Sequence, residues 1–215
     1  MKLELKNLYK DFTVRNLFKT EKKSVLEDIN LTLEESDILG LLGRNGAGKT
    51  TLLKIILGLI HPTKGSVIFS GKKDPLFGFA NSNPRSFFWR ISVLENLNYF
   101  LSFHIQSKSK RIETISKLLR YFDLDDKKSE LFSKLSAGER MKVSLIRSFS
   151  KNARIYLFDE VFNSLDENTS EKLASLMKNN QNSINIVVSH RDPEIDSLCN
   201  KKYEIKEKTL HELSQ

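Results

Sequence analysis

The sequence predicts an α/β fold with a mostly parallel core sheet, because short apolar runs alternate with helical segments along its 215 residues. Residues 38–42, 155–158 and 184–188 have the length and composition typical of strands buried on both faces. Between the first two runs, residues 90–134 keep a helical spacing of apolar side chains and predict an inserted lobe of helices. We therefore expect helices to cover both faces of the sheet.

The first third of the chain predicts strands around a loop. Residues 3–8 roughly alternate apolar with polar side chains, and residues 25–33 alternate with period two. The stretch between them, residues 13–23, is polar and basic and is expected to form a loop. The next expected elements are a strand at 38–42, a helix at 49–59, a turn at 62–65, a strand at 67–69 and a turn at 70–71.

The rest of the chain predicts helices and further strands. Ile112, Ile115, Leu119 and Phe122 recur on one helical face, and the basic residues among them are expected to be solvated. Beyond that face, the expected elements are a helix from Ser136 to about Phe149, a strand at 155–158, a helix at 171–178 and a strand at 184–188.

The composition excludes some classes of protein. With 39% hydrophobic and 29% charged residues, the chain has too much apolar material for a disordered protein. Its formal net charge of +8 suits a phosphate-rich ligand, nucleic acid or an anionic membrane face, without choosing among them. The one cysteine, Cys199, rules out an intramolecular disulfide, favours a reducing cytosolic setting and is expected to be buried.

Neither a membrane span nor a signal peptide is expected. The most apolar stretch, residues 55–60, is far shorter than the roughly 20 residues needed to cross a bilayer. The first residues alternate charge with leucine, which is a strand pattern. If the protein serves a membrane, we expect it to do so from outside the lipid.

A glycine-rich turn follows the first buried strand and opens a helix. It matches the phosphate-loop pattern without a mismatch and consists of Gly43, Arg44, Asn45, Gly46, Ala47, Gly48, Lys49 and Thr50. Glycines let the backbone curl so that amide N–H groups face phosphate oxygens, and the helix N-terminus adds partial positive charge. Lys49 is expected to reach the outer phosphates and Thr50 to ligate Mg²⁺. The alternative, a chance glycine turn, does not explain the flanking strand and helix.

Two carboxylates end the strand at 155–158. The carboxyl ends of parallel strands are where α/β sheets bind ligands. Asp159 is expected to hold Mg²⁺ directly or through water, and Glu160 to act as general base on the attacking water. Two solvated acids are the alternative, which the intact phosphate loop disfavours.

Residues 135–139, Leu-Ser-Ala-Gly-Glu, lie shortly before the acidic strand and resemble the signature of ABC ATPases, usually LSGGQ. Ala137 and Glu139 depart from that pattern. Ser136, Gly138 and the helix N-terminus would form an anion site, while Ser136 with Glu139 also fits a capping box. We expect both interpretations to hold. On these residues the chain resembles the nucleotide-binding domain of ABC transporters.

Further matches extend this resemblance over nearly the whole chain. Residues 163–166, Asn-Ser-Leu-Asp, resemble the D-loop, and His190 resembles the switch histidine that contacts the γ-phosphate in the family. The resemblance adds Thr51 to the nucleotide contacts. Phe12 resembles the aromatic residue that stacks on adenine. Core packing of Phe12 is the alternative, with Tyr9 the second candidate for stacking.

The chain departs most from the family at the Q-loop, because residues 77–90 contain no glutamine. Asn83 sits closest to the expected place and keeps an amide oxygen that can ligate Mg²⁺ on a shorter arm. Residues 86–90, Ser-Phe-Phe-Trp-Arg, resemble a variant found in export-type members. These aromatics predict either a socket for a membrane partner's coupling helix or packing between the lobes.

The resemblance implies one ABC-type nucleotide-binding domain with a RecA-like core, about 1–84 and 136–215, N-terminal antiparallel strands and a helical subdomain at about 85–135. It implies ATP and Mg²⁺ as ligands and ATP hydrolysis that powers transport. It also implies two partners: a second ATPase subunit, identical or not, that sandwiches two ATP molecules, and an integral-membrane permease. The chain is then peripheral on the cytoplasmic face of the membrane, and no nucleic acid is expected.

Two alternatives to a transporter motor stay open. One is a soluble ABC ATPase for nucleic-acid or assembly work, compatible with the charge of +8 but lacking a second ATPase unit, a coiled-coil insertion and an RNA-binding arm. The other is an ATP-binding regulator without turnover, which Glu160 and His190 argue against. The transported substrate is not readable from the chain.

Overall fold

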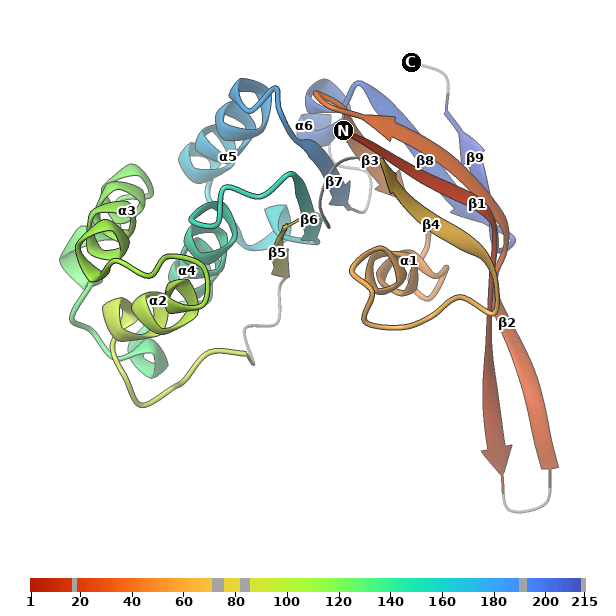
Figure 1. Ribbon diagram of the computed structural model, residues 1–215, viewed down its shortest axis with the longest axis horizontal. Coiled ribbons are helices and arrows are strands. Elements are labelled where there is room, and N and C mark those ends of the chain that lie inside the picture. The colour runs from red at the N-terminus through yellow and green to blue at the C-terminus, as the bar shows by residue number, and fades with distance from the viewer. Residues whose placement is uncertain (17–18, 71–75, 82–85, 190–192, 214–215) are drawn as a thin grey trace. The chain divides into compact units, whose positions relative to one another are not determined.

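The computed structural model of the protein describes residues 1–16, 19–70, 76–81, 86–189 and 193–213 (Figure 1). The chain forms two compact units. One, here the strand-rich unit, comprises Met1–Pro75 and Gln181–Gln215, and the other, here the helical unit, comprises Leu76–Asn180.

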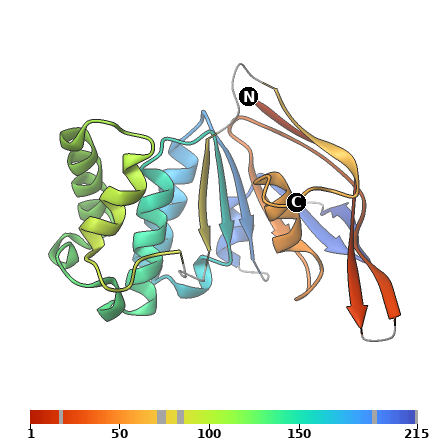
Figure 2. The same ribbon diagram turned by 60° about the horizontal axis from the view of Figure 1, so that its bottom comes forward.

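The strand-rich unit begins with an antiparallel sheet. Its strands, in the order β2-β1-β4, are β1 (Lys2–Asn16), β2 (Lys19–Glu34) and β4 (Lys64–Ser70). Leu3, Leu5 and Leu8 are buried, which confirms the alternation predicted at the N-terminus. Because β4 pairs with β1 only as far as the pair Tyr9–Lys64, the rest of the β1–β2 hairpin extends beyond that strand (Figures 1 and 2).

The predicted loop at residues 13–23 is wrong, since most of it belongs to this hairpin. Thr13 pairs with Lys22, and Val14 pairs with Glu21. The pairing uses backbone groups, and the side chains whose burial is described in this part, at residues 13–14 and 20–23, are exposed: Val14, for example, keeps 42% of its surface accessible. A strand that buries neither face needs no apolar alternation, so the sequence carries no period-two signal there.

A second sheet of the strand-rich unit carries the core. β3 (Ile38–Leu42) pairs in parallel with β7 (Ile184–Val188) and β8 (Lys201–Lys206), and β9 (Thr209–Glu212) runs antiparallel to β8. Every residue of β3 and β7 is buried, as their apolar runs predict. Helices α1 (Lys49–Ile56) and α6 (Pro193–Leu198) complete the unit, and α1 has the predicted type but ends earlier than predicted.

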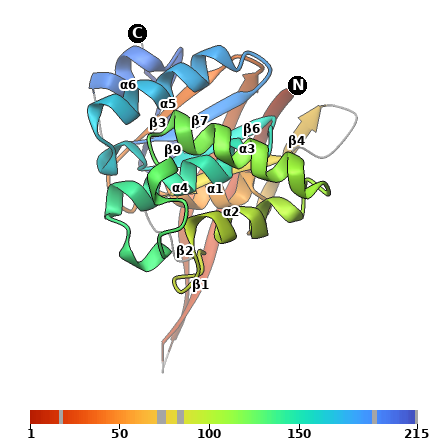
Figure 3. The same ribbon diagram turned by 90° about the vertical axis from the view of Figure 1, so that its left-hand side faces the viewer.

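The helical unit contains two parallel strands and a set of packed helices. The strands are β5 (Phe77–Asn81) and β6 (Ile155–Asp159). The helices are α2 (Val93–Ser102), α3 (Lys108–Tyr121), α4 (Ala137–Phe149) and α5 (Glu167–Asn179), with short 3₁₀ turns η1 (Asp125–Lys127), η2 (Phe132–Lys134) and η3 (Phe162–Ser164). Figure 3 shows α2, α3 and α4 side by side. Ile115, Leu119 and Phe122, on the predicted apolar face, are fully buried.

Capping residues set where the helices of this unit begin. Ser136 caps α4 where predicted. Helix α5 begins at Glu167, four residues before the predicted start, because the Asp166 carboxylate accepts a hydrogen bond of 2.7 Å from the Thr169 N–H. In the described ranges, no helix combines the length and the apolar character that a bilayer span requires.

Candidate functional site

Glycine geometry shapes the loop between β3 and α1. Gly48, at the N-cap of α1, has a φ of 110°, and a Cβ atom there would lie 2.8 Å from Cδ2 of Leu26. Gly43 has a φ of 142°, and its Cβ would lie 2.8 Å from the carbonyl oxygen of Ile205. Both positions therefore exclude any side chain, for reasons of space as well as of backbone conformation.

Lys49 is turned into this loop. Lys49 is only 5% exposed, and its Nζ donates hydrogen bonds to the carbonyl oxygens of Gly43 at 2.6 Å and Arg44 at 3.2 Å. Gly48 has no side chain to accept from the first N–H groups of α1, and the first turn of α1 holds no acidic residue. A helix N-terminus with a cation beside it suits an anion such as phosphate.

The other loop residues lie where a ligand can approach them. Arg44, Asn45, Gly46 and Thr50 are exposed, whereas Ala47 and Thr51 are half-buried. The Ala47 N–H donates to the Arg44 carbonyl at 3.1 Å, which closes the turn before the helix. The hydroxyl of Thr50 thus belongs to an exposed residue of the first turn of α1.

The acidic pair ends strand β6 in the helical unit. Asp159 is the last residue of the strand and pairs in register with Asn81 of β5. Glu160 follows in the left-handed region, with a φ of 57°. Non-glycine residues held in that region are strained, and such strain clusters at functional sites. Both carboxylates are half-buried at the strand end, where sequence analysis places them.

The signature residues open helix α4 with the predicted capping box. The Ser136 hydroxyl accepts from the Glu139 N–H at 3.2 Å, and the Glu139 carboxylate accepts from the Ser136 N–H at 2.8 Å. This backbone hydrogen bond, more than the Ser136 hydroxyl or nearby lysines, lowers the pKa of Glu139. The capping box uses the amides of Ser136 and Glu139, so those of Ala137 and Gly138 stand outside it.

The D-loop residues lie against the signature helix. A Cβ atom on Gly138 would come within 3.3 Å of the Ser164 carbonyl oxygen. Lys142, one turn further along α4, forms an ion pair of 3.4 Å with Asp166, the cap of α5. Two motifs separated by more than twenty residues in sequence therefore share a contact in the helical unit.

The aromatic run that follows the Q-loop divides into a buried and an exposed part. Phe87 is 3% exposed and stacks on Phe132 with ring centres 4.6 Å apart. Phe88 and Trp89 keep 47% and 43% of their surface accessible. Phe87 therefore packs inside the helical unit, its two successors are exposed, and the socket for a membrane partner stays a prediction.

Sequence reasoning missed the residues that hold this run in place. Asn96 is fully buried in α2, its Oδ1 accepts from the Phe88 N–H at 2.8 Å and its Nδ2 donates to the Phe88 carbonyl at 2.9 Å. Arg147 of α4 donates to Ser86 Oγ at 2.7 Å and lies 4.3 Å from the Phe87 ring centre. Burial lowers the pKa of Arg147 to about 10. The sequence signal that could have revealed this contact is Asn96, an asparagine at a core position of a helix.

Of the remaining predicted residues, the structure describes Phe12 and Tyr9 but not Asn83 and His190. Phe12 lies in strand β1, is 39% exposed and has Lys10 Nζ 4.9 Å from its ring centre, so core packing is excluded. Its adenine-stacking role stays a prediction. Tyr9 is half-buried, with Lys64 Nζ 5.9 Å from its ring centre. Asn83 and His190 lie outside the described residues, and their roles stay predictions as well.

Comparison with known proteins supports the same family. A sequence profile described as ABC transporter matches residues 26–163, more than half of the chain. Lipoprotein-releasing system ATP-binding protein LolD of Buchnera aphidicola is 30% identical over 187 residues, covering 79% of this chain and 81% of LolD. Methionine import ATP-binding protein MetN 2 of Enterococcus faecalis is 32% identical over 93% of this chain, which spans 61% of that relative's length.

Solved structures confirm the predicted fold class. The bacterial ABC transporter cassette MJ0796, solved as a dimer, superposes with a TM-score of 0.84 over 99% of both chains, at 23% sequence identity. A metal-chelate type ABC transporter in an inward-facing conformation superposes with a TM-score of 0.76 over 99% of this chain. The phosphate loop, the acidic strand end and the capped signature helix thus occur on the fold of such cassettes, and the chain belongs to the ABC transporter family.

Proposed function

We propose that the chain is the ATP-binding and ATP-hydrolysing subunit of an ABC membrane transporter and powers translocation through a separate permease. The observation that carries this proposal is the loop before α1. Gly43 and Gly48 admit no side chain there, and the buried ammonium group of Lys49 lies against the loop's own carbonyls. This arrangement supports the binding of a triphosphate on backbone amides.

Nucleotide binding is proposed to use residues of the strand-rich unit. Lys49 would exchange the Gly43 and Arg44 carbonyls for the oxygens of the outer phosphates, a charge-assisted contact. Phe12, exposed on β1, would stack on the adenine ring. Further contacts are proposed for Arg44, Asn45, Gly46, Ala47, Thr50 and Thr51 of the loop.

The donor set fits Mg²⁺, which prefers hydroxyl, carboxylate and amide oxygens. Thr50 supplies an exposed hydroxyl, Asp159 a carboxylate, and Asn83 is proposed to supply an amide oxygen. When bound, Mg²⁺ would neutralise charge on the outer phosphates. Glu160 is proposed to accept the proton of the attacking water, and His190 to contact the γ-phosphate.

A second ATPase subunit is proposed to complete each site. The signature residues Ser136, Ala137, Gly138 and Glu139 would contact the γ-phosphate held by the partner subunit's phosphate loop. The helix N-terminus and the amides outside the capping box support this role. Since both subunits would contact one γ-phosphate, ATP would favour the closed pair and hydrolysis would release it. The pair is either identical or mixed.

The permease is proposed to dock on exposed aromatics of the helical unit. Phe88, Trp89, Tyr99 and Phe103 are between 43% and 64% exposed, and Tyr99 contacts both Phe88 and Phe103 edge to face. A cluster of this kind suits burial by a partner's helix. The chain would then be peripheral on the cytoplasmic face of the membrane. The names of the relatives speak of methionine, taurine and lipoproteins, so the substrate stays open.

Purification of the tagged chain from membranes of its own cells tests this proposal. We expect an integral-membrane protein to co-elute in detergent and the eluate to hydrolyse ATP. The Phe88→Asp variant should no longer co-elute with the integral-membrane protein. The Leu59→Asp variant, changed at an exposed leucine of the strand-rich unit, should still co-elute with it. Co-elution of nucleic acid with no membrane protein would favour a soluble ABC ATPase instead.

A further inference from the structure

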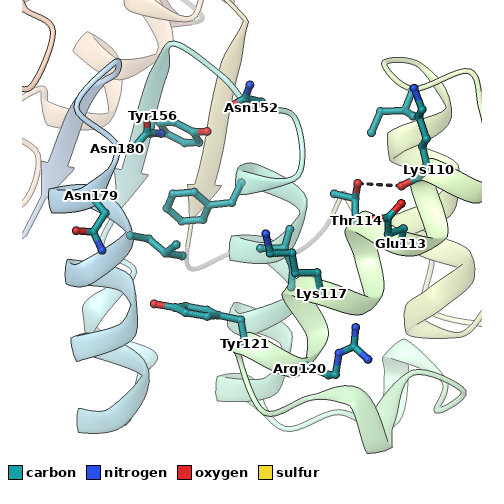
Figure 4. A pocket seen from close by; sticks show the side chains of 14 residues that line it. Lys110, Glu113, Thr114, Lys117, Arg120, Tyr121, Asn152, Tyr156, Asn179 and Asn180 are labelled. Carbon is teal, nitrogen blue, oxygen red and sulfur yellow. Dashed lines mark hydrogen bonds between the residues drawn. The ribbon is translucent and has the colours of Figure 1, made fainter.

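The helical unit holds a cavity of about 1170 Å³, bounded by α3, the segment between α4 and β6, and the end of α5 (Figure 4). None of the described residues that line it belongs to the phosphate loop, the acidic pair, the signature or the D-loop. Tyr156 lines it from the start of β6, three residues before Asp159, which is about 10 Å along a strand. The cavity is therefore separate from the residues proposed to serve ATP.

Flat apolar groups form the inner walls of this cavity. Phe149 and Tyr156 stack with ring centres 4.8 Å apart and planes 27° apart. The Tyr156 hydroxyl accepts from the Ala153 N–H at 3.0 Å, which fixes the ring. On the facing side, the Tyr121 hydroxyl donates to the Lys172 carbonyl at 3.0 Å. Tyr156 is only 1% exposed, so Phe149 and Tyr121, both half-buried, are the rings that a planar apolar ligand body would contact.

The same cavity is positively charged. Lys110, Lys117 and Arg120 line it together with one carboxylate, Glu113, so three cations against one anion leave a net charge of +2. In the described part of the chain, none of these three cations lies within ion-pair distance of a carboxylate. Figure 4 shows Lys117 extending from α3 into the space between that helix and α5.

Amide side chains supply hydrogen-bonding groups beside the charge. Asn152 follows α4, Asn179 is the last residue of α5 and Asn180 follows it; all three line the cavity, and Figure 4 shows Asn180 beside Tyr156. A ligand site with mostly apolar walls, a few polar groups and one sign of charge is typical of small-molecule pockets. We propose that this cavity binds a small organic anion with an aromatic or fused-ring body, independently of ATP.

Two fluorescent probes with related aromatic rings test this proposal. The anion is 8-anilino-1-naphthalenesulfonate, and the neutral control is N-phenyl-1-naphthylamine, which lacks the sulfonate. We expect saturable binding of one anionic probe per chain, unchanged by saturating ATP with Mg²⁺, and weaker binding of the neutral probe. Displacement of the probe by ATP would place it in the nucleotide site and overturn the proposal, as would the absence of saturable binding.

Charge variants locate the probe. Lys117→Glu should weaken binding of the anionic probe by about tenfold, because an attraction becomes a repulsion, and should leave the neutral probe unaffected. The Lys117→Arg variant, which keeps the positive charge, should bind the anionic probe like the wild type. The matched control is Lys128→Glu, an exposed lysine of the same unit outside the cavity. Equal affinities for the anionic probe in Lys117→Glu and Lys128→Glu proteins of equal thermal stability would contradict the proposal.

Discussion

The guanidinium carbon of Arg140 lies 4.5 Å from the centre of the Trp89 ring. Arg140 directly follows the signature residues in α4 and also donates to the Ser133 carbonyl at 2.8 Å. Trp89 is part of the exposed aromatic surface and meets Phe132 edge to face at 5.9 Å. The signature helix and the proposed permease surface therefore share a direct contact within the helical unit.

The exposure of the aromatic surface predicts that it serves partner binding rather than nucleotide binding. Trp89→Ala should weaken binding to the permease by at least about tenfold, since an exposed aromatic anchor is typically worth more than 1–2 kcal/mol at an interface. Nucleotide affinity should change little. The two quantities are measured on the same protein, by detergent co-purification and by ATP titration. A loss of ATP affinity with intact permease binding would contradict the assignment of the aromatic surface to the permease.

Glu160→Gln tests the proposed general base. The variant should bind ATP with unchanged affinity but hydrolyse it about 10²–10⁴-fold more slowly, the usual contribution of a positioned base. It should also accumulate the ATP-bound pair. Glu171→Gln, an exposed carboxylate on α5, serves as the control and should keep full turnover. Unimpaired hydrolysis by the Glu160 variant would remove this residue from the mechanism.

Gly48 and Gly58 form a matched pair for the loop geometry. Both have positive φ values, 110° and 71°, but only at Gly48 does a Cβ meet another atom, Leu26 Cδ2 at 2.8 Å. Gly48→Ala should therefore destabilise the protein by about 1–3 kcal/mol and impair nucleotide binding. Gly58→Ala should cost only its backbone strain of about 1–2 kcal/mol and leave binding intact. Urea unfolding measures the stabilities and ATP titration the binding, and an equal loss of nucleotide affinity in both variants would refute the steric argument.

Cys199 provides a test of packing, because burial raises the pKa of its thiol to about 12 and the residue is 7% exposed. Only the thiolate reacts with iodoacetamide, so alkylation of the folded protein should be slow at pH 8 and should still rise with pH above 10. The unfolded chain, with an ordinary pKa near 8.5, should react fast and level off by about pH 10. Rapid alkylation of the folded protein at pH 8 would contradict the burial.

Much of the fold follows from local sequence, and the exceptions share a cause. Strands β3, β6 and β7 are predictable because burial on both faces demands uninterrupted apolar runs. The hairpin arms and strands β8 and β9 were not predicted, because polar and charged residues together dominate them. Lys201, for instance, begins β8 and forms an ion pair of 2.8 Å with Asp37 rather than packing in a core.

The candidate site also has parts that local sequence predicts and parts that it does not. The phosphate loop and the capping box of Ser136 and Glu139 are local motifs, so sequence alone locates them. Which aromatic of the run 87–89 is buried depends on Phe132, more than forty residues away, and no local pattern carries that information. Asn96 and Arg147, which hold the run, likewise act through contacts that only the folded chain creates.

Titration of the purified chain with fluorescent ATP, compared with its Lys49→Ala variant, tests the central claim most directly. The wild-type chain should bind one nucleotide per chain, and the variant should bind at least about tenfold more weakly, since a charge-assisted contact contributes about 1.5–3 kcal/mol. Lys54→Ala, which removes an exposed lysine from the same helix, should bind like the wild type. Equal affinity in all three proteins, or no binding to any of them, would contradict the proposal that this loop cradles the triphosphate.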